Sequence, residues 1–579
     1  MPDTGGQNLD HLVQNWLQAF DAALESGSGL GDLFLDECFW RDVLASSWTM
    51  QTMSGQQSIA EALLVGNRMR NFRLADGRTP PRAVARAGED CIEALIEFDA
   101  AAGPGAGVVR LKPGPDGAPG CWTLLTALDG LEDHPERVGR DRPTGQSHSR
   151  DFRGPNWLDQ RQAAMAYEDR DPAVLIVGGG QAGLDIAARL GALGVDALVV
   201  DSHERIGDNW RKRYHALTLH NQVQVNHMPY MPFPPGWPTY IPKDKLANWF
   251  EAYVDAMEIN YWPSTTFHGA ERDVAAGCWT ARVERDGAAR TLRPRHIVMA
   301  TGVSGIPNRP EIPALADFEG PVLHSSAYQD GEDWAGRSAV VIGTGNSGHD
   351  ISHDLASSGA EVTLVQRSPT LIVNIEPSAQ LPYALYDEGP PLEDCDLIVL
   401  STPTALSKRT HRMLTKKARE LDRELLDGLT AKGFRLDDGP DGTGWQFKYL
   451  TRGGGYYFNV GASDMIVRDE IGLAQFGDIE GFGPRSVRIG GEERDCDLVV
   501  LATGYQPQEM LVERLFGAEV TERVGPIWGF GDGEELRNMY VRTPQPGLFF
   551  IAGSLAQCRI NSKYLALQIQ AVEAGMIPA

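Results

Sequence analysis

The pattern GxGxxG, typical of a turn that binds a dinucleotide, occurs twice in this chain. Each copy directly follows an apolar run, the first at Gly178, Gly180 and Gly183 and the second at Gly343, Gly345 and Gly348. The missing side chains let a strand turn sharply into a helix and let a pyrophosphate approach the free N–H groups of the helix N-terminus. Both segments therefore predict nucleotide sites, in which we expect Gln181, Asn346 and Ser347 to take part.

The residues that end the next strand differ between the two copies. In the first copy, the strand that follows the helix ends in Asp201-Ser202. An acid at this place accepts hydrogen bonds from ribose hydroxyls. In the second copy, the corresponding strand ends in Gln366-Arg367. An arginine at this place can pair with a 2′-phosphate, which a carboxylate would repel. This difference favours NADPH over NADH at the second site. An arginine that stacks on the adenine of either cofactor, or an exposed arginine beside a helix cap, remains an alternative.

Each glycine turn has to be positioned by a strand–helix–strand unit, and the sequence contains two such units. Residues 172–201 and 338–367 share the order apolar strand, glycine turn, helix and second strand. This internal repeat predicts an α/β fold with two Rossmann-like domains. Two dinucleotide sites in one chain indicate that electrons pass from a nicotinamide to a second cofactor, which is most simply FAD.

Later apolar strands complete these domains. Two of them end in small residues, the strand 296–302 in Thr301-Gly302 and the strand 497–505 with Thr503-Gly504. Glycine at a strand end lets the backbone come close to a cofactor or a neighbouring domain. A last strand at 547–553 precedes a helix, and we expect the N-terminus of that helix near Ser562, facing the flavin.

Composition restricts the class of protein. The 579 residues suffice for three or four domains. The formal net charge of −25 repels phosphate backbones and anionic lipids, so we expect neither nucleic acid nor a membrane as a partner. The seven cysteines form no CxxC pair, which favours reduced thiols in the cytoplasm and disfavours a cysteine zinc site. His349 and His353 are spaced i, i+4 but lack the glutamate of HExxH, so we expect no metal.

The pattern FxGxxxHxxxY stands just before the second glycine turn, formed by Phe318, Gly320, His324 and Tyr328. It resembles the signature of the class B flavoprotein monooxygenases. Its final tyrosine is similar to the flavin-containing and N-hydroxylating branch, whereas the Baeyer–Villiger branch ends in tryptophan. GDNW at 207–210 and the stretch 217–246 also resemble this family, including its plant auxin-forming branch. The resemblance extends over residues 172–579.

The N-terminal part resembles an NTF2/SnoaL-like cone, an α+β domain, in its helical pattern at 8–24 and its segment 33–63. Combined with the flavoprotein part, it resembles the N-terminally extended, type II flavin-containing monooxygenases. The division that this implies is an NTF2/SnoaL-like domain at 1–130, a linker at 131–171, an FAD-binding domain at 172–330 that resumes at 501–579, and an NAD(P)H-binding domain at 331–500.

The resemblance implies an FAD-dependent NAD(P)H:O2 monooxygenase. NADPH, with NADH also accepted by many type II members, would reduce FAD, and O2 would then give a C4a-(hydro)peroxyflavin. This intermediate would oxygenate a small organic substrate, either by Baeyer–Villiger oxidation of a ketone or at nitrogen or sulfur. The partners are then the substrate and O2, and we expect a homodimer.

The resemblance also implies roles for single residues. His220 falls where many flavin-containing monooxygenases carry an asparagine near the flavin, and Asn221 stands beside it. Either residue is therefore expected to act catalytically. Trp210 and Gln222 are expected to line the flavin. The histidine and tyrosine of the signature are expected to join the domains without touching substrate.

Two other function classes fit parts of the sequence. An NADPH-dependent flavin oxidoreductase without oxygen insertion is disfavoured by the missing CxxC and by the FxGxxxHxxxY pattern. A ligand-binding protein that uses the N-terminal cone is disfavoured because both glycine turns are complete.

Overall fold

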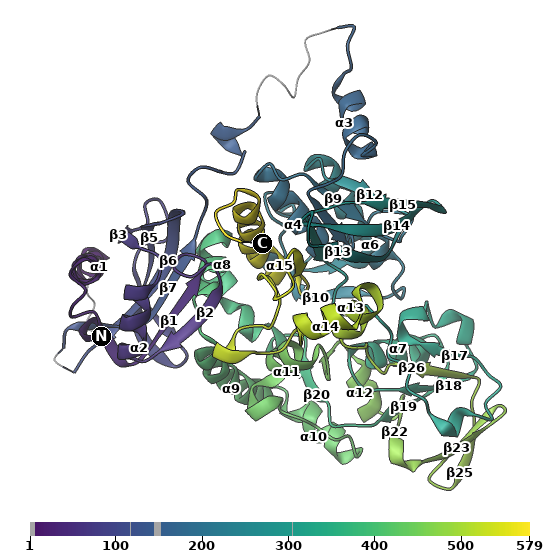
Figure 1. The fold of residues 1–579 in the computed structure, drawn as a ribbon. Coiled ribbons are helices and arrows are strands. Elements are labelled where there is room, and N and C mark those ends of the chain that lie inside the picture. Colours follow the sequence, from purple (N-terminus) through teal and green to yellow (C-terminus); the bar gives the residue numbers. More distant parts are fainter. Residues whose placement is uncertain (1–5, 116, 144–151, 304, 579) are drawn as a thin grey trace.

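The computed structural model describes residues 6–115, 117–143, 152–303 and 305–578. Figure 1 shows an N-terminal domain on one side and two larger α/β domains on the other. Within the described residues, no helix is long and apolar enough to cross a membrane. All seven cysteines are buried and unpaired, as expected from their spacing.

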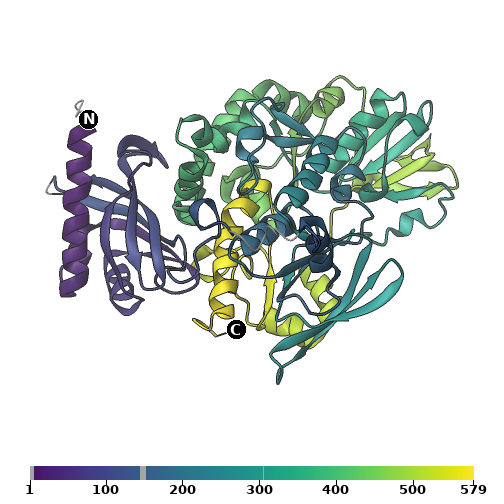
Figure 2. The same ribbon diagram turned by 90° about the horizontal axis from the view of Figure 1, so that it is seen from above.

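The N-terminal domain is a seven-stranded sheet with helices α1 (Gly6–Ser26) and α2 (Gln56–Val65). Its strand order is β2-β1-β7-β6-β5-β3, and β4 pairs with β5. The strands are β1 (Phe34–Val43), β2 (Met50–Ser54), β3 (Met69–Leu74), β4 (Arg82–Arg86), β5 (Glu89–Ala100), β6 (Gly103–Pro113) and β7 (Pro119–Leu128). Figure 2 shows α1 on the side that faces away from the rest of the chain. Trp16 and Phe20 of α1 are buried in an apolar cluster with this sheet.

The first α/β domain centres on a parallel sheet in the order β12-β9-β8-β16-β27. Its strands are β8 (Val174–Val177), β9 (Ala197–Val200), β12 (Asn260–Trp262), β16 (His296–Met299) and β27 (Leu548–Phe550). Every residue of β8 and β9 is buried, as parallel strands covered on both faces require. Helices α4 (Gln181–Ala192) and α15 (Leu555–Glu573) pack against each other beside this sheet.

Smaller elements complete this domain. They are α5 (Asp208–Arg211), β10 (Thr218–Gln222), β11 (Tyr240–Pro242), α6 (Lys243–Ala256), and the antiparallel sheet of β13 (Thr265–Asp273), β14 (Cys278–Arg285) and β15 (Ala288–Leu292). The first glycine turn and the strand end at Thr301-Gly302 follow neighbouring strands, β8 and β16. Carboxyl ends of parallel strands meet at one edge, so the two segments lie side by side.

The last helix begins earlier than the sequence prediction near Ser562, which was wrong. α15 starts at Leu555 because Ser554 and Gln557 form a capping box, in which the amide of each residue donates to the side chain of the other (both 3.2 Å). Ser562 is buried inside the helix. Gln181 Nε2 donates to the Gly553 carbonyl (3.1 Å), so the N-termini of α4 and α15 lie together.

The second α/β domain repeats this plan in the order β17-β26-β18-β19-β22. Its elements are β17 (Val322–His324), β18 (Ser338–Ile342), α7 (Asn346–Ser357), β19 (Glu361–Gln366), β22 (Gly472–Gln475), β26 (Leu498–Leu501), and the small antiparallel sheet of β23 (Ile479–Gly483), β24 (Ser486–Ile489) and β25 (Glu492–Asp495). The expected boundary at residue 331 is too late, because β17 pairs with β26 in this sheet.

A mostly helical insertion between β19 and β22 was not anticipated. It contains α8 (Leu392–Leu400), α9 (Thr404–Leu421), α10 (Arg423–Ala431), α11 (Gly444–Arg452), α12 (Ala462–Val467) and the paired strands β20 (Leu371–Asn374) and β21 (Tyr456–Asn459). Two further helices, α13 (Gln508–Phe516) and α14 (Ala518–Val524), follow β26. The expected linker 131–171 includes helix α3 (Trp157–Ala166), and its residues 144–151 lie outside the described part.

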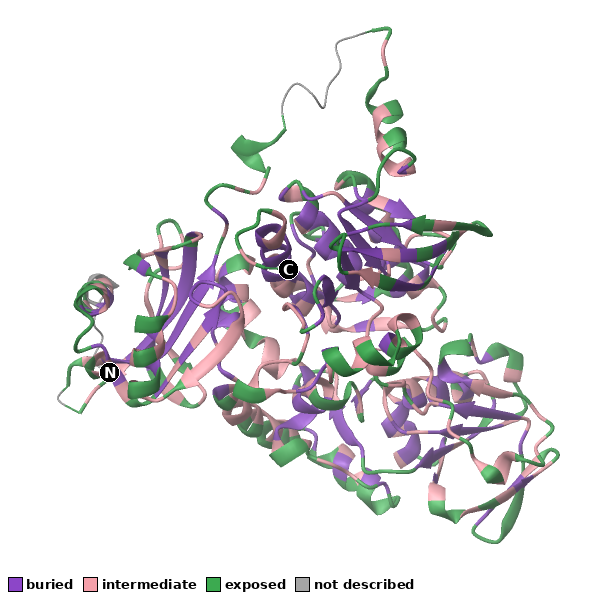
Figure 3. Ribbon diagram, in the orientation of Figure 1, coloured by how far each residue is buried: buried purple, intermediate pink, exposed green. Residues whose placement is uncertain are grey.

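The centre of the N-terminal sheet, around β6 and β7, is buried on both faces. One face packs under α1 and α2. On the other, Leu95, Val108 and Leu125 belong to the same apolar cluster as β8 and β9 of the first α/β domain. Figure 3 shows buried residues along these strands, in contrast to exposed residues along α9 and α10.

Ion pairs fasten the same interface. Arg41 donates two hydrogen bonds to Glu535 (2.8 and 2.7 Å). Arg78 Nε donates to Asp394 Oδ1 of α8 (2.7 Å). Because such pairs are directional, they fix how the N-terminal sheet lies on the insertion and on the segment around Glu535 that precedes β27.

Glu93 of β5 organises a buried charge cluster next to this interface. Its fully buried carboxylate accepts hydrogen bonds from Arg82, Arg86 and Arg110 (2.9 Å each). Arg86 also donates to Glu388, beyond the domain boundary (3.0 Å). Burial alone would raise the pKa of Glu93, but the arginines outweigh it and lower the pKa to about 2.

We predict that Glu93→Gln lowers the free energy of unfolding at pH 7 by about 3 kcal/mol, because it leaves the buried Arg110 without a counter-charge. A carboxylate with a depressed pKa stabilises the fold above its ordinary pKa of 4.5, and this contribution is lost as the pH falls toward about 2. The difference between wild type and variant in urea unfolding should therefore shrink over that window.

The exposed Glu522→Gln provides the matched control. It removes one charge without touching the cluster and should show no such pH dependence. A wild-type-to-Glu93→Gln difference that stays constant between pH 7 and pH 3 would contradict the assignment.

Candidate active site

A cavity of about 2130 Å³ opens between the two α/β domains. Its walls contain both glycine turns, the two small strand ends, the N-terminus of α15 and parts of α11 and β21. The predicted site residues that line it are Gly178, Gly180, Gln181, Asp201, Ser202, Trp210, His220, Asn221, Thr301, Gly302, Gly343, Gly345, Asn346, Ser347, Gly348, Arg367, Thr503 and Gly504. Residues over 300 positions apart in sequence therefore share one cavity.

The first glycine turn is shaped by a close approach of backbone to backbone. Gly178 has φ +110°, and a Cβ there would lie 2.6 Å from the Ala300 carbonyl oxygen at the end of β16. Gly183 does not line the cavity. A Cβ on it would lie 1.9 Å from the Gly178 carbonyl oxygen, inside the turn. Both positions therefore require glycine, for packing as much as for a ligand.

The second turn repeats this geometry. Gly343 has φ +116°, and a Cβ there would lie 2.3 Å from the Ala502 carbonyl oxygen after β26. A Cβ at Gly348 would lie 1.8 Å from the Gly343 carbonyl oxygen. By contrast, a Cβ at Gly345 would meet only the Tyr456 carbonyl oxygen, at 3.7 Å. Gly345 therefore has the most open surroundings of the three glycines in this turn, and it lines the cavity.

Asp201 holds the first turn as well as lining the cavity. Its Oδ2 accepts from the Gly179 amide (2.7 Å), and its Oδ1 accepts from the His203 amide (2.8 Å) and lies 2.7 Å from His203 Nδ1. Burial alone would raise the pKa of Asp201, but these hydrogen bonds outweigh it and lower the pKa. The carboxylate therefore stays ionised and still offers lone pairs to a ligand.

The second site ends in an exposed arginine. Arg367 directly follows β19 and lines the cavity, as the sequence indicates. Arg435 donates to its carbonyl oxygen (2.7 Å), which fixes the backbone there. Asn346 at the start of α7 accepts a hydrogen bond from the Phe458 amide (3.0 Å), which joins this turn to β21.

Among the buried polar atoms of the wall that have no hydrogen-bond partner within the described residues, two belong to residues that are adjacent in sequence. They are Asn209 Oδ1 and Trp210 Nε1, at the short helix α5. Buried polar groups without partners cost free energy, so their position in the wall fits a bound polar molecule. Together with the glycine turn beside them, they fit a dinucleotide at the first site.

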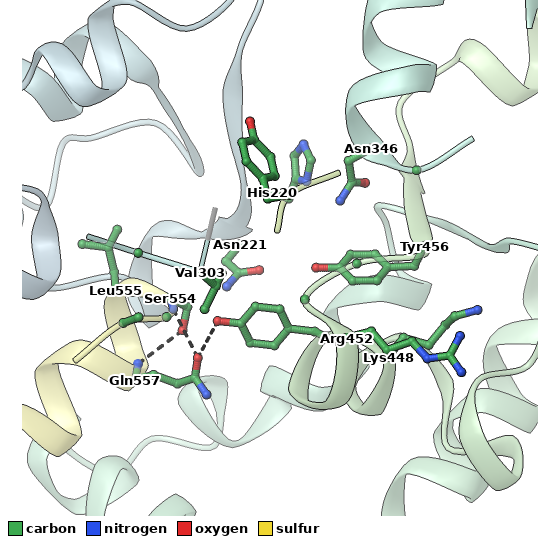
Figure 4. A pocket seen from close by; sticks show the side chains of 18 of the residues that line it. His220, Asn221, Val303, Asn346, Lys448, Arg452, Tyr456, Ser554, Leu555 and Gln557 are labelled. Carbon is green, nitrogen blue, oxygen red and sulfur yellow. Dashed lines mark hydrogen bonds between the residues drawn. The ribbon is translucent and has the colours of Figure 1, made fainter. Parts of the chain in front are cut away.

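His220 and Asn221 of β10 also face this cavity (Figure 4). The ring of His220 lies edge-to-face on Phe458, with centroids 5.5 Å apart. Burial lowers the pKa of His220, and the nearby Asp350 opposes that shift. The Asn221 carbonyl accepts from Asn226 (2.9 Å), which holds the end of β10 in place.

Gln222 does not line the cavity, contrary to expectation. Its side-chain amide contacts Glu376 (3.4 Å) and Gln224 (2.7 Å) instead. Gln222 is the last residue of β10, and these contacts hold its side chain outside the cavity.

The FxGxxxHxxxY residues also lie outside the cavity. That they join the domains stays a prediction, and the packing of Tyr214 from the first domain against the apolar cluster that contains Tyr328 is consistent with it. His324 Nε2 lies 3.0 Å from the Gly504 carbonyl oxygen, and the Tyr328 hydroxyl donates to Asp354 of α7 (2.7 Å). Phe318 packs over Gly320. The hydrogen bonds of His324 and Tyr328 stay within the second α/β domain, where they hold β17, the end of β26 and α7 together.

The insertion supplies a wall that sequence reasoning missed. Its Phe, Trp and Tyr residues that line the cavity are Tyr383, Tyr386, Trp445, Tyr449, Tyr456 and Phe458. Figure 4 shows Tyr456 with Lys448 and Arg452 beside it. Lys448 pairs with Asp437, whereas no ion pair of Arg452 occurs among the described residues. The run FKYLTRGGGYYF, rich in aromatic and basic residues, was the available signal.

Known proteins resemble this chain over the same region. The sequence pattern of the pyridine nucleotide-disulphide oxidoreductases matches residues 175–384. The indole-3-pyruvate monooxygenase YUCCA1 of Oryza sativa subsp. japonica is 32% identical over 352 residues, which cover 60% of this chain and 80% of that protein. The chain belongs to the class B flavoprotein monooxygenases.

Further comparisons agree with this family. The probable indole-3-pyruvate monooxygenase YUCCA9 of Arabidopsis thaliana is 30% identical over 336 residues, 57% of this monooxygenase and 74% of that protein. A structure of OTEMO in complex with FAD and NADP has a TM-score of 0.51 and 16% identity, covering 70% of this chain and 87% of that one. A structure of a steroid monooxygenase bound to NADP has a TM-score of 0.51 and 18% identity, covering 70% of this chain and 86% of that one. These structures share the fold of this monooxygenase.

We predict that Gly343→Ala raises the KM for NADPH at least about tenfold, equivalent to about 1.4 kcal/mol, while flavin stays bound. The added Cβ would displace the Ala502 carbonyl that shapes the second turn. Gly178→Ala should instead release flavin, because its Cβ strikes Ala300 in the first turn. Flavin absorbance after gel filtration and steady-state NADPH kinetics measure the two effects.

Gly359→Ala is the matched control, since Gly359 also has a positive φ of +90° but has nothing within 4 Å of the added Cβ. It should change neither quantity. If Gly343→Ala and Gly178→Ala lost the same cofactor, the assignment of two separate turns would be wrong.

Proposed function

We propose that this monooxygenase binds FAD at the first glycine turn and NADPH at the second, and uses O2 to oxygenate a small carbonyl compound. The observation that supports the proposal is that both turns open into one cavity. When bound, the flavin supplies the redox and oxygen-transfer chemistry. The protein then has to bind, orient and keep water out.

The chain offers binding groups suited to each nucleotide. Asp201 and the N-terminus of α4 face the first site, and Arg367 and the N-terminus of α7 face the second. Helix N-termini favour the negative pyrophosphate. An arginine after the second strand favours NADPH, and because that arginine is exposed we propose that NADH is accepted more weakly.

The aromatic wall of the insertion serves to exclude water from the reacting centre. Tyr449 donates to Gln557 Oε1 (2.7 Å), which ties α11 to the start of α15. Trp445 and Phe458 lie edge-to-face, with ring centroids 4.8 Å apart. A closed apolar wall of this kind protects a reactive oxygen donor from loss as peroxide. His220 and Asn221 are then the polar groups closest to the chemistry in our proposal.

Arg452 favours a substrate that carries a negative charge. It lines the cavity at the end of α11, beside the aromatic residues. The relatives named above are indole-3-pyruvate monooxygenases, and that substrate is an aromatic 2-oxo acid. We therefore propose a carbonyl substrate with a carboxylate as the preferred class, ahead of neutral ketones, amines and sulfides.

The N-terminal domain fits an NTF2-like cone in this proposal. Two helices cover one face of its seven-stranded sheet, and residues such as Arg110 and Trp122 of that sheet reach the cavity wall. We further propose that the enzyme works in the cytoplasm as a homodimer.

We predict that the purified protein is yellow, consumes NADPH with O2, and does so faster with an aromatic 2-oxo acid than with a neutral ketone or a sulfide. Mass spectrometry of the product and a peroxide assay test this. NADPH consumption that yields only peroxide with every substrate would point to the flavin oxidoreductase without oxygen insertion. A colourless protein that cannot be reconstituted with FAD would overturn the proposal.

A second prediction concerns Arg367→Ala, which should raise the KM for NADPH at least about tenfold, since a charge-assisted pair with the 2′-phosphate is lost. The KM for NADH should change less than twofold. Arg468→Ala removes the same charge from this domain at an exposed pair with Glu470 and serves as the control. Equal effects of Arg367→Ala on both coenzymes would remove its phosphate role.

A further inference from the structure

A carboxylate of the second α/β domain reaches the candidate catalytic histidine of the first. Asp350 stands on α7, one helical turn after Asn346, and its Oδ2 lies 4.0 Å from His220 Nε2. The Tyr214 hydroxyl donates to the same Oδ2 (2.5 Å). Tyr214 and His220 line the cavity, whereas Asp350 lies behind them.

The surroundings leave the imidazole few other polar partners. Phe458 covers it edge-to-face, and Gln380 bonds its backbone carbonyl (3.0 Å) but not its ring. The side chains of His220 and Asp350 are 21% and 11% exposed. Burial raises the pKa of Asp350, whereas His220, Tyr214 and His353 act to lower it. Tyr457 also faces this carboxyl group.

We propose that Asp350 and Tyr214 are positioning residues for His220. They hold Nε2–H toward the carboxylate, so that Nδ1 is the nitrogen presented to the cavity. The inference rests on the proposed function, in which His220 acts beside the reacting centre.

Three physical points support this arrangement. A neutral imidazole has one donor and one acceptor nitrogen, and a carboxylate beside one nitrogen selects the tautomer. The gap of 4.0 Å is longer than a hydrogen bond, but such contacts are often long without substrate and tighten in the complex. The hydrogen bond from the Tyr214 hydroxyl holds the Asp350 carboxylate in place. The imidazole of His220 is therefore oriented toward an acceptor in a fixed position.

The position of this group also follows from the fold. α7 begins at the second glycine turn, and β10 belongs to the first domain. The imidazole orientation is therefore set jointly by both domains. A nicotinamide site that is out of place would leave His220 without its orienting carboxylate.

The first test is a titration of the flavin-loaded enzyme labelled with 13C at histidine Cε1, with the His220 signal assigned from His220→Asn. Asp350→Asn should lower the pKa of His220, because the carboxylate that favours the imidazolium is gone. Asp354→Asn, one turn further along α7, should leave the titration unchanged. An identical His220 titration in wild type and Asp350→Asn would overturn the inference.

The second test is a double-mutant cycle on coupling. Asp350→Asn should increase the peroxide released per NADPH consumed about tenfold, a small effect on the scale of acid–base groups, with anaerobic flavin reduction by NADPH unchanged within about twofold. In the His220→Asn background the same substitution should have no further effect, because residues that act through one another are not additive. Additive effects would assign Asp350 a merely structural role.

The outcomes separate this inference from the proposed function. If wild type oxygenates no substrate, the proposed function fails whatever Asp350 does. If wild type oxygenates and Asp350→Asn matches it in both tests, only the positioning role fails. Should Asp350→Asn not fold, Tyr214→Phe keeps the question open to test, because it loosens the carboxylate and should raise peroxide release in the same direction.

Discussion

Both α/β domains depend on the same close contact between two backbone segments, a glycine turn and the end of the neighbouring strand. In each α/β domain the first glycine of the turn lies against the carbonyl of the neighbouring strand end, Ala300 in one case and Ala502 in the other. No side chain fits between them. The small residues after β16 and β26 therefore serve the packing of the turn as well as any ligand. With this contact in place, the helix that follows each turn aims its N-terminus into the cavity.

Local attraction has to overcome an unfavourable overall field. The chain carries a formal net charge of −25, and both expected cofactors are polyanions. In the cavity wall, helix N-termini and basic residues such as Arg367 and Arg452 supply a local positive potential. Because screened charges act over about 10 Å at ordinary ionic strength, groups in the wall decide binding and the remote acidic surface does not.

The features that follow from sequence are those set by short-range spacing. Both turns, the succession of strand, turn, helix and strand around each of them, and the arginine after β19 are of this kind. The start of α15 was readable too, since Ser554 and Gln557 form the capping pattern S-x-x-Q, yet the prediction placed it at Ser562. The link between Tyr214 and Asp350 was out of reach, because its partners stand 136 residues apart and meet only where two domains touch. Gln222 was misplaced for the same reason, because its partner Glu376 stands 154 residues away in the sequence.

The double burial of the N-terminal sheet sets a limit on how this chain can be divided. Leu95, Val108 and Leu125 share one apolar cluster with the strands of the first α/β domain. A cut in the connecting segment would expose that face on both fragments. Neither fragment would then present a finished surface, and both would tend to associate with themselves or with each other. A chimera that exchanges the substrate pocket of this chain therefore has to keep the N-terminal sheet together with the strands that it covers.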